Sequence, residues 1–161
     1  LLDEAIATDR CYLFEEDFVT PPAQAALAAD FAIHSCLYAC TAGLEAALTG
    51  KRVLMLDRDG WDKSCIYQLG LGTVVFRDWD TLWEALDQHW HGRPVRGFGD
   101  WTPILNDLDP FQDGKAAFRM AAYIKWIIEG FRQGLCKETI LADAAERYAR
   151  EWGQDKVVQL Q

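Results

Sequence analysis

The chain has 161 residues, 50% of them hydrophobic and 25% charged, so it suits one compact domain with a real core, or one domain plus a helical extension. Its 25 acidic and 16 basic residues give a formal net charge of -9, and no run of Lys or Arg forms a stripe. This balance argues against nucleic acids and anionic membrane surfaces as main partners.

The chain shows no membrane span or secretion signal. No apolar stretch approaches the ~20 residues that a span requires. The first residues, LLDEAIATDR, lack the basic and apolar regions of a signal peptide. We therefore expect a cytoplasmic protein. The sequence opens without Met on what reads as the middle of an element, which indicates a piece cut from a longer protein.

The cysteines and histidines predict no metal site. An odd number of scattered cysteines without a C-x-x-C pair indicates buried thiols in a reducing compartment rather than disulfides or zinc ligands. The five are Cys11, Cys36, Cys40, Cys65 and Cys136. His89 and His91 have no third His or Cys nearby. We expect no metal and no cofactor.

In chain order, short apolar runs alternate with helical patterns. Strands are predicted at residues 11–14, 31–34, 52–56 and 73–76. Helices are predicted at residues 23–29, 43–48, 61–69 and 80–89, and Gly50 is a well-placed stop for the second of them. Such alternation predicts an α/β fold with a doubly wound, mainly parallel sheet that helices cover on both faces.

The last third of the chain has a different texture. Residues 92–110, rich in glycine, proline, tryptophan and aspartate, read as an ordered loop or boundary. A long helix is predicted at 114–132 with Asp113 as its cap, and a last helix at 137–152. We therefore expect a Rossmann-like α/β domain at residues 1–110 and a helical extension packed on it at 111–161.

The loop at residues 35–43 has the features of an anion site. In an open α/β sheet, ligands bind outside the carboxyl ends of the strands, where a helix N-terminus carries partial positive charge. Small residues at Ala42 and Gly43 let an anion approach the backbone, so a diphosphate can bind with few basic side chains. Ser35 and Thr41 can add hydroxyl donors, although Thr41 can equally cap the helix.

Two ionisable residues flank this loop. Glu45 lies early in an otherwise apolar helix, where a carboxylate can accept two hydrogen bonds from a vicinal diol such as ribose; the alternative is that it complements the helix dipole. His34 ends the preceding strand and can contact a phosphate, although a satisfied, partly buried histidine is the alternative. Asp57, Asp59 and Asp62 flank the end of the next strand and can bind a cation or the hydroxyls of a donor sugar, although turn formation and helix capping explain them more simply.

The segment from Ala29 to Val53 resembles the donor-binding segment of GT-B fold glycosyltransferases, in the branch that makes bacterial surface and capsular polysaccharides. The similar strings in this segment are ADFAI at 29–33, Ser35 and TAGLEAALTGKRV at 41–53. Two later pieces are also similar: GLGTVVF at 70–76, and DPFQDGKA at 109–116 with Arg119, which resembles a tail element of surface-carbohydrate biosynthesis proteins.

This resemblance implies that Glu45 binds the ribose of a nucleotide-sugar donor and that a phosphate pocket lies beside it. The pocket residues would be Ser35, Thr41, Ala42 and Gly43, with His34 next to them. It also implies that the acceptor site and the catalytic base belong to an N-terminal Rossmann-like half outside this chain, so the catalytic residues are unknown and the isolated fragment does not transfer sugar.

Two other functions fit the same pattern. The chain can be a non-catalytic regulatory or assembly module on an α/β fold, with its last two helices as the interaction surface. It can also belong to a nucleotide-sugar epimerase-like enzyme, in which a ribose-binding glutamate serves the same purpose.

Overall fold

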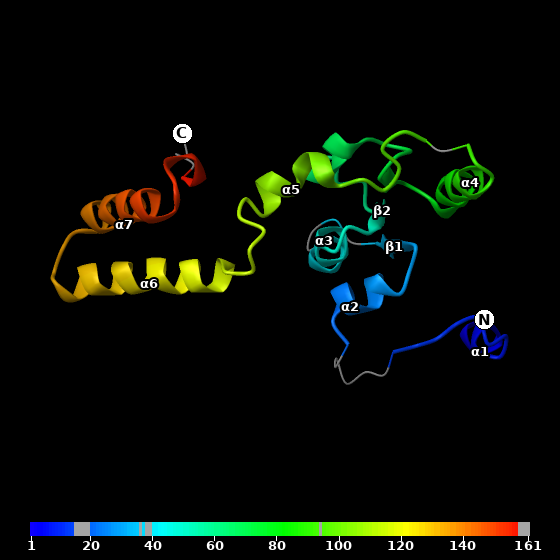
Figure 1. Cartoon of the computed structure of the whole chain (residues 1–161), viewed down its shortest axis with the longest axis horizontal. Helices are drawn as coiled ribbons and strands as arrows, with labels where there is room; N and C mark the ends of the chain where they lie inside the picture. Colours follow the sequence, from blue (N-terminus) through cyan, green and yellow to red (C-terminus); the bar gives the residue numbers. More distant parts are fainter. Residues whose placement is uncertain (15–19, 36, 38–39, 94, 158–161) are drawn as a thin grey trace. The chain divides into compact units, whose positions relative to one another are not determined.

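The computed structural model of the chain describes residues 1–14, 20–35, 37, 40–93 and 95–157. It divides into two compact units, Leu1–Leu105 and Asn106–Gln161, and each is described by itself below. Figure 1 labels the helices α1–α7 and the strands β1 and β2.

The first unit is built on a parallel sheet of three strands in the order β1-β2-β3: β1 (Phe31–His34), β2 (Arg52–Leu56) and β3 (Val75–Phe76). His34 pairs with Met55, and Leu56 pairs with Phe76, so all three strands end at the same side of the sheet. Together with the helices α1–α7 of the described ranges, this open sheet confirms the predicted α/β class.

The helix α3 (Thr41–Leu48) connects β1 to β2, and the 3-10 helix η1 (Cys65–Leu69) connects β2 to β3. Two helices precede β1, α1 (Leu2–Ile6) and α2 (Pro22–Leu27), and two follow β3, α4 (Trp79–Trp90) and α5 (Thr102–Leu108). Pro22 lies in the first turn of α2, where a backbone N–H would have no hydrogen-bond partner within the helix, so its absence costs nothing. Asp78 caps α4, since its Oδ1 accepts a hydrogen bond of 2.8 Å from the Thr81 amide.

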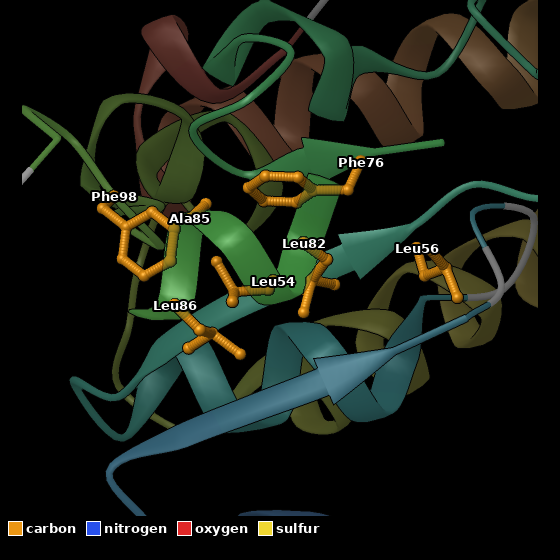
Figure 2. Close-up of a cluster of buried hydrophobic side chains, with 7 residues drawn as sticks. All are labelled: Leu54, Leu56, Phe76, Leu82, Ala85, Leu86 and Phe98. Carbon is orange, nitrogen blue, oxygen red and sulfur yellow. The ribbon is translucent and has the colours of Figure 1, made fainter. Parts of the chain in front are cut away.

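β2 is buried on both faces, because its alternate side chains meet different helices. On one face α3 packs closely: a Cβ placed on Gly43 would lie 3.4 Å from Met55 Sδ and 3.6 Å from a Val53 methyl carbon. On the other face Leu54 and Leu56 join a core cluster with residues of β3, α4 and the loop after α4. Figure 2 shows its members: Leu54, Leu56, Phe76, Leu82, Ala85, Leu86 and Phe98.

The loop before α5 continues the hydrogen-bond ladder beside β2. The Gly99 carbonyl accepts from the Val53 amide at 2.9 Å, and the Gly99 amide donates to the Thr73 carbonyl at 3.0 Å. The indole of Trp101, only 2% exposed, donates from Nε1 to the Val53 carbonyl at 3.1 Å. Gly99 has a φ of 67°, and a Cβ there would lie 2.8 Å from the Cβ of Arg52, so only glycine fits.

The second unit is a helical hairpin of α6 (Ala116–Arg132) and α7 (Lys137–Trp152), followed by the short 3-10 helix η2 (Gln154–Lys156). Gly130 permits close approach of the two helices, since a Cβ there would lie 2.7 Å from an Ile140 side-chain carbon. Aromatic rings fill the rest of this contact, with Trp126 and Trp152 stacked at 5.4 Å.

The structure corrects several expected elements. Residues 11–14 form no strand, because no neighbouring strand in the described residues offers them a hydrogen-bond partner; the rings of Tyr12 and Phe14 pack on each other instead. Within 92–110, where a loop was predicted, lies the helix α5. The predicted helix at 61–69 is the shorter η1, and the predicted strand at 73–76 narrows to β3.

The predicted cap of the long helix is also wrong. α6 begins after Lys115 without a side-chain cap, and the Asp113 carboxylate instead pairs with Arg119, whose Nη1 and Nη2 lie 2.9 and 2.5 Å from its two oxygens. The guanidinium also stacks 3.5 Å from the ring centroid of Phe111. Asp113 therefore anchors a buried arginine, which sequence spacing does not reveal.

The cysteines were expected to be buried thiols, and that part of the prediction is wrong for those that the structure describes. Cys65 and Cys136 are exposed, and Cys11 and Cys40 are partly buried; none of these four is in a disulfide. Cys36 lies outside the described residues.

Within the described ranges, no helix is both long enough and apolar enough to cross a membrane.

Candidate functional site

The predicted site begins where β1 ends. His34 is the last residue of β1 and is partly buried, Ser35 follows it and is exposed, and α3 starts at Thr41. Between them Leu37 is buried, at 6% exposure. Residues 36, 38 and 39 of the predicted loop lie outside the described residues. The strand-to-helix order that the sequence predicted is therefore present around the loop.

A cleft of about 280 Å³ runs along β1 between α2 and α3. Three of the predicted site residues line it: His34, Ala42 and Gly43. The rest of its lining is largely apolar and small: Pro22, Ala25, Ala26, Ala29, Phe31, Ala32, Ile33 and Ala46. This β1 cleft thus joins an apolar wall to the first turn of a helix.

Thr41 and Glu45 lie one turn apart on α3, so they share a face of the helix, and neither lines the β1 cleft. Thr41 is exposed and Glu45 partly buried. The N-cap residue is Cys40, with no side-chain capping bond, so the Thr41 hydroxyl does not cap α3. Neither side chain has a hydrogen bond or ion pair with the described part of the chain, which leaves both available to a ligand.

A side chain at Gly43 would point toward the sheet. A Cβ there would meet Met55, Val53 and the ring of Trp101 at 3.4–3.6 Å, which is ordinary van der Waals contact. The small size of Gly43 therefore serves the packing of α3 on β2. Ala42, by contrast, lines the cleft with a side chain that can limit what enters it.

A second polar cluster lies at the carboxyl end of β2, around the predicted turn. Asp57 is 3% exposed, and its Oδ1 accepts from the amides of Asp59 at 3.2 Å and Gly60 at 3.0 Å. The Tyr67 hydroxyl donates to the other carboxylate oxygen, Oδ2. Both oxygens of Asp57 are therefore engaged, one in the predicted turn and one with η1.

Arg77 directly follows β3 and belongs to the same cluster. Burial is the main cause that raises the pKa of the Tyr67 hydroxyl, followed by its hydrogen bond to Asp57, whereas Arg77 lowers this pKa. The carboxyl ends of all three strands thus carry polar side chains: His34, Asp57 and Arg77. The signal in the sequence was their position, since His34 is the last residue of its strand and Asp57 and Arg77 each directly follow theirs.

Another cleft, of about 300 Å³, lies at the amino end of β2, beside Lys51, Arg52, Asp100 and Thr102. Most of its polar groups form hydrogen bonds with other groups of the protein. Arg52 Nη1 donates to the Phe98 carbonyl at 2.5 Å, and Asp100 Oδ1 accepts from the Thr102 amide at 2.9 Å. Hydrogen bonds from Thr102, and secondarily the charge of Arg52, lower the pKa of Asp100.

No cluster of three or more His, Cys, Asp or Glu side chains suited to a metal ion occurs among the residues that the structure describes. His89, near the end of α4, stacks on Phe98 with ring centroids 5.1 Å apart and lies edge-on to Phe31 at 5.2 Å. It is a packing residue of the first unit.

Comparison with protein-family models, with curated proteins and with solved structures found no match to this chain.

Proposed function

We propose that this chain is the nucleotide-sugar-binding half of a glycosyltransferase in bacterial surface polysaccharide biosynthesis. The observation that carries the proposal is the β1 cleft, because His34, Ala42 and Gly43 line it where a parallel strand leads into a helix. Phosphate-bearing ligands commonly bind at such a junction. The likeness of residues 29–53 to the donor-binding segment of GT-B enzymes supplies the ligand class.

The groups at this junction suit the parts of a nucleotide sugar. The amides of Thr41, Ala42 and Gly43 have no carbonyl partner within α3, and with the helix dipole they suit the diphosphate. The apolar wall of α2 and α3 suits the flat face of a base or sugar ring. Glu45, one turn further along, suits the ribose diol, and His34 and Ser35 suit the phosphate oxygens.

Size decides how much of the donor enters the β1 cleft. Ligand pockets commonly measure ~300–1,000 Å³, and this cleft measures about 280 Å³. It therefore takes one ring system of the donor, while the diphosphate lies over the first turn of α3. Arg77 offers a cation at the same end of the sheet, two strands or roughly 10 Å away.

The proposal includes the doubly wound arrangement of a GT-B half. Within the described residues β1 pairs with β2 alone, so its outer side is available to a further strand. In a doubly wound sheet the strand order reverses at such a position. The loop after β1 would then lie at the point of reversal, where ligands of open α/β sheets bind.

Transfer itself needs a second Rossmann-like domain that holds the acceptor and supplies the catalytic base. The role of this chain is to hold the donor and to stabilise the diphosphate leaving group with the amides and dipole of α3 as its charge develops. We place the enzyme in the cytoplasm.

Calorimetric titration with UDP-, CMP-, CDP- and GDP-linked sugars tests the proposal. We expect one class to bind, and Glu45→Ala to weaken that binding about tenfold or more, because hydrogen bonds to a charged group contribute about 1.5–3 kcal/mol. Glu146→Ala on α7 is the matched control and should leave affinity unchanged. Absence of binding by every donor class would refute the proposal, and unchanged affinity of Glu45→Ala would remove Glu45 from the site.

A further inference from the structure

The helix α4 exposes three tryptophans on one side. Trp79, Trp83 and Trp90 are 47%, 54% and 61% exposed. Their spacing places them in one stripe, beside the buried stripe of Leu82 and Leu86. The rings of Trp79 and Trp83 stack at 6.3 Å with 27° between their planes, and Trp90 lies edge-on to Phe31 at 5.9 Å. Contacts with neighbouring rings therefore orient the stripe.

Three carboxylates lie next to these rings. Asp80, Glu84 and Asp87 are exposed, and their helical positions put them along the side of the tryptophan stripe that points away from the core. Over its 12 residues, WDTLWEALDQHW, α4 has no lysine or arginine. Among the described residues, Glu84 accepts a hydrogen bond from Gln88 at 3.3 Å, and Asp87 contacts His91, also on the surface. We call these six residues the aromatic–acidic face of α4.

Such a face has a specific chemical complement. Tryptophan is the aromatic residue that binds cations best over its ring, and arginine also stacks on it through its flat guanidinium. A carboxylate beside the ring pairs with the same cation. Among the described residues, the cations that lie over aromatic rings contact Phe111 and Trp126, so none of them occupies this face.

We propose that the aromatic–acidic face of α4 binds an arginine-rich segment of another protein. Large exposed apolar surface marks interaction sites, and tryptophan is enriched among residues that dominate binding energy. The net charge of -9 also draws basic partners toward the chain. A second copy of this chain is a poor occupant, because two such faces would bring six carboxylates together. This interaction does not depend on donor binding.

The test uses a synthetic helical peptide with arginines one turn apart, and the same peptide with citrulline at those positions, which keeps the shape and removes the charge. Fluorescence anisotropy measures the affinity of each peptide for the whole chain. We expect the arginine peptide to bind about tenfold tighter or more than the citrulline peptide, a difference of about 1.4 kcal/mol.

Two double variants locate the contact. Trp79→Ala with Trp83→Ala, and Glu84→Gln with Asp87→Asn, should each weaken arginine-peptide binding about tenfold. Asp143→Asn with Glu146→Gln on α7 removes the same charge elsewhere and should change it less than about twofold. Circular dichroism melting confirms that each variant is folded.

Three outcomes would overturn the proposal: equal binding of both peptides, equal loss in the α7 control, or self-association of the wild-type chain that the tryptophan variant abolishes. The second would show that the overall negative charge of the chain, rather than the aromatic–acidic face, attracts the peptide. The third would show that a second copy is the occupant.

Discussion

The Tyr67 hydroxyl donates a hydrogen bond to Asp57 Oδ2, and so ties η1 to the carboxyl end of β2. The other oxygen of Asp57 accepts two backbone amides. A nearly buried carboxylate with both oxygens engaged therefore shapes this end of the sheet, where β1 also ends and where we propose that the donor binds.

Tyr67→Phe should lower the free energy of unfolding by about 1–3 kcal/mol, because it leaves Asp57 Oδ2 buried without its donor. Urea denaturation followed by circular dichroism measures this change. Tyr12→Phe is the control, since Tyr12 is 76% exposed and its hydroxyl has no hydrogen-bond partner in the described part of the chain. It should stay within about 0.5 kcal/mol of wild type. Equal effects of the two variants would contradict the role given to the Tyr67–Asp57 bond.

Gly99→Ala should destabilise the first unit more than Gly97→Ala does. Both glycines have a positive φ, of 67° and 78°, so both substitutions cost about 1–2 kcal/mol of backbone strain. A Cβ at Gly99 would in addition lie 2.8 Å from the Cβ of Arg52 and 3.2 Å from the Val53 amide nitrogen, whereas a Cβ at Gly97 meets no atom within 4 Å. Overpacking of this kind adds about 1–3 kcal/mol. Thermal denaturation measures the melting temperature of each variant. Similar melting temperatures would show that the loop shifts to accommodate a Cβ at Gly99.

The Asp113–Arg119 pair should make the second unit sensitive to acid. The bidentate contact with Arg119 holds the pKa of Asp113 well below its ordinary range. The ionised form is thus favoured in the folded state. Its contribution to stability is complete above the pKa of the unfolded chain, about 3.9, and is lost as the pH falls below that value.

Melting temperatures read from the helical circular dichroism signal between about pH 5 and pH 2 check this prediction, since the loss occurs below the unfolded pKa of ~3.9. Asp113→Asn should be less stable than wild type at neutral pH and should lose less stability on acidification. Asp143→Asn, an exposed change on α7, should keep the wild-type slope. An equally steep slope in Asp113→Asn would show that other carboxylates dominate.

Ala42→Leu and Gly43→Ala should separate ligand access from helix packing. Ala42 lines the β1 cleft, so a leucine there should fill it. Donor affinity should then fall about tenfold or more, because the ring of the donor can no longer enter the cleft. The Cβ of Gly43→Ala would face Met55 and Trp101 at ordinary contact distances and should leave affinity within about twofold. Titration with the donor that binds wild type measures both. A larger loss in Gly43→Ala than in Ala42→Leu would reverse the assignment of the two positions.

The sequence predicted those elements whose signals are local. β1 and β2 are short apolar runs, and α4 and α7 keep a helical period between clear ends, so β1 and β2 agree at both ends, α7 at both ends, and α4 within one residue at each. Residues 11–14 had the same apolar signal, but a strand also needs a partner backbone, which pattern alone does not supply.

Other features depend on contacts between residues far apart in the chain. Trp101 and Gly99 bind β2 from 48 and 46 positions away, and that is why a segment that reads as a loop is buried. In α6 the apolar period is right, but the contact with α7 uses Gly130 and Trp126, while Met120 and Ile124 are exposed. The period identifies an apolar face, and only the partner decides which residues are covered.

At the candidate site, chain order predicted the junction of His34, Ala42 and Gly43, because a parallel strand followed by a helix fixes it. The Asp57–Tyr67 bond and the nearby Arg77 arise from the register of three strands, which the sequence does not encode locally.

The measurement that tests the central claim most directly is amide chemical-shift mapping of the whole chain by NMR with a nucleotide-sugar donor. We predict that the donor shifts the amides of Thr41, Ala42, Gly43 and Glu45, together with His34. Shifts confined to Lys51, Asp100 and Thr102 at the amino end of β2, or no shifts with any donor class, would contradict it.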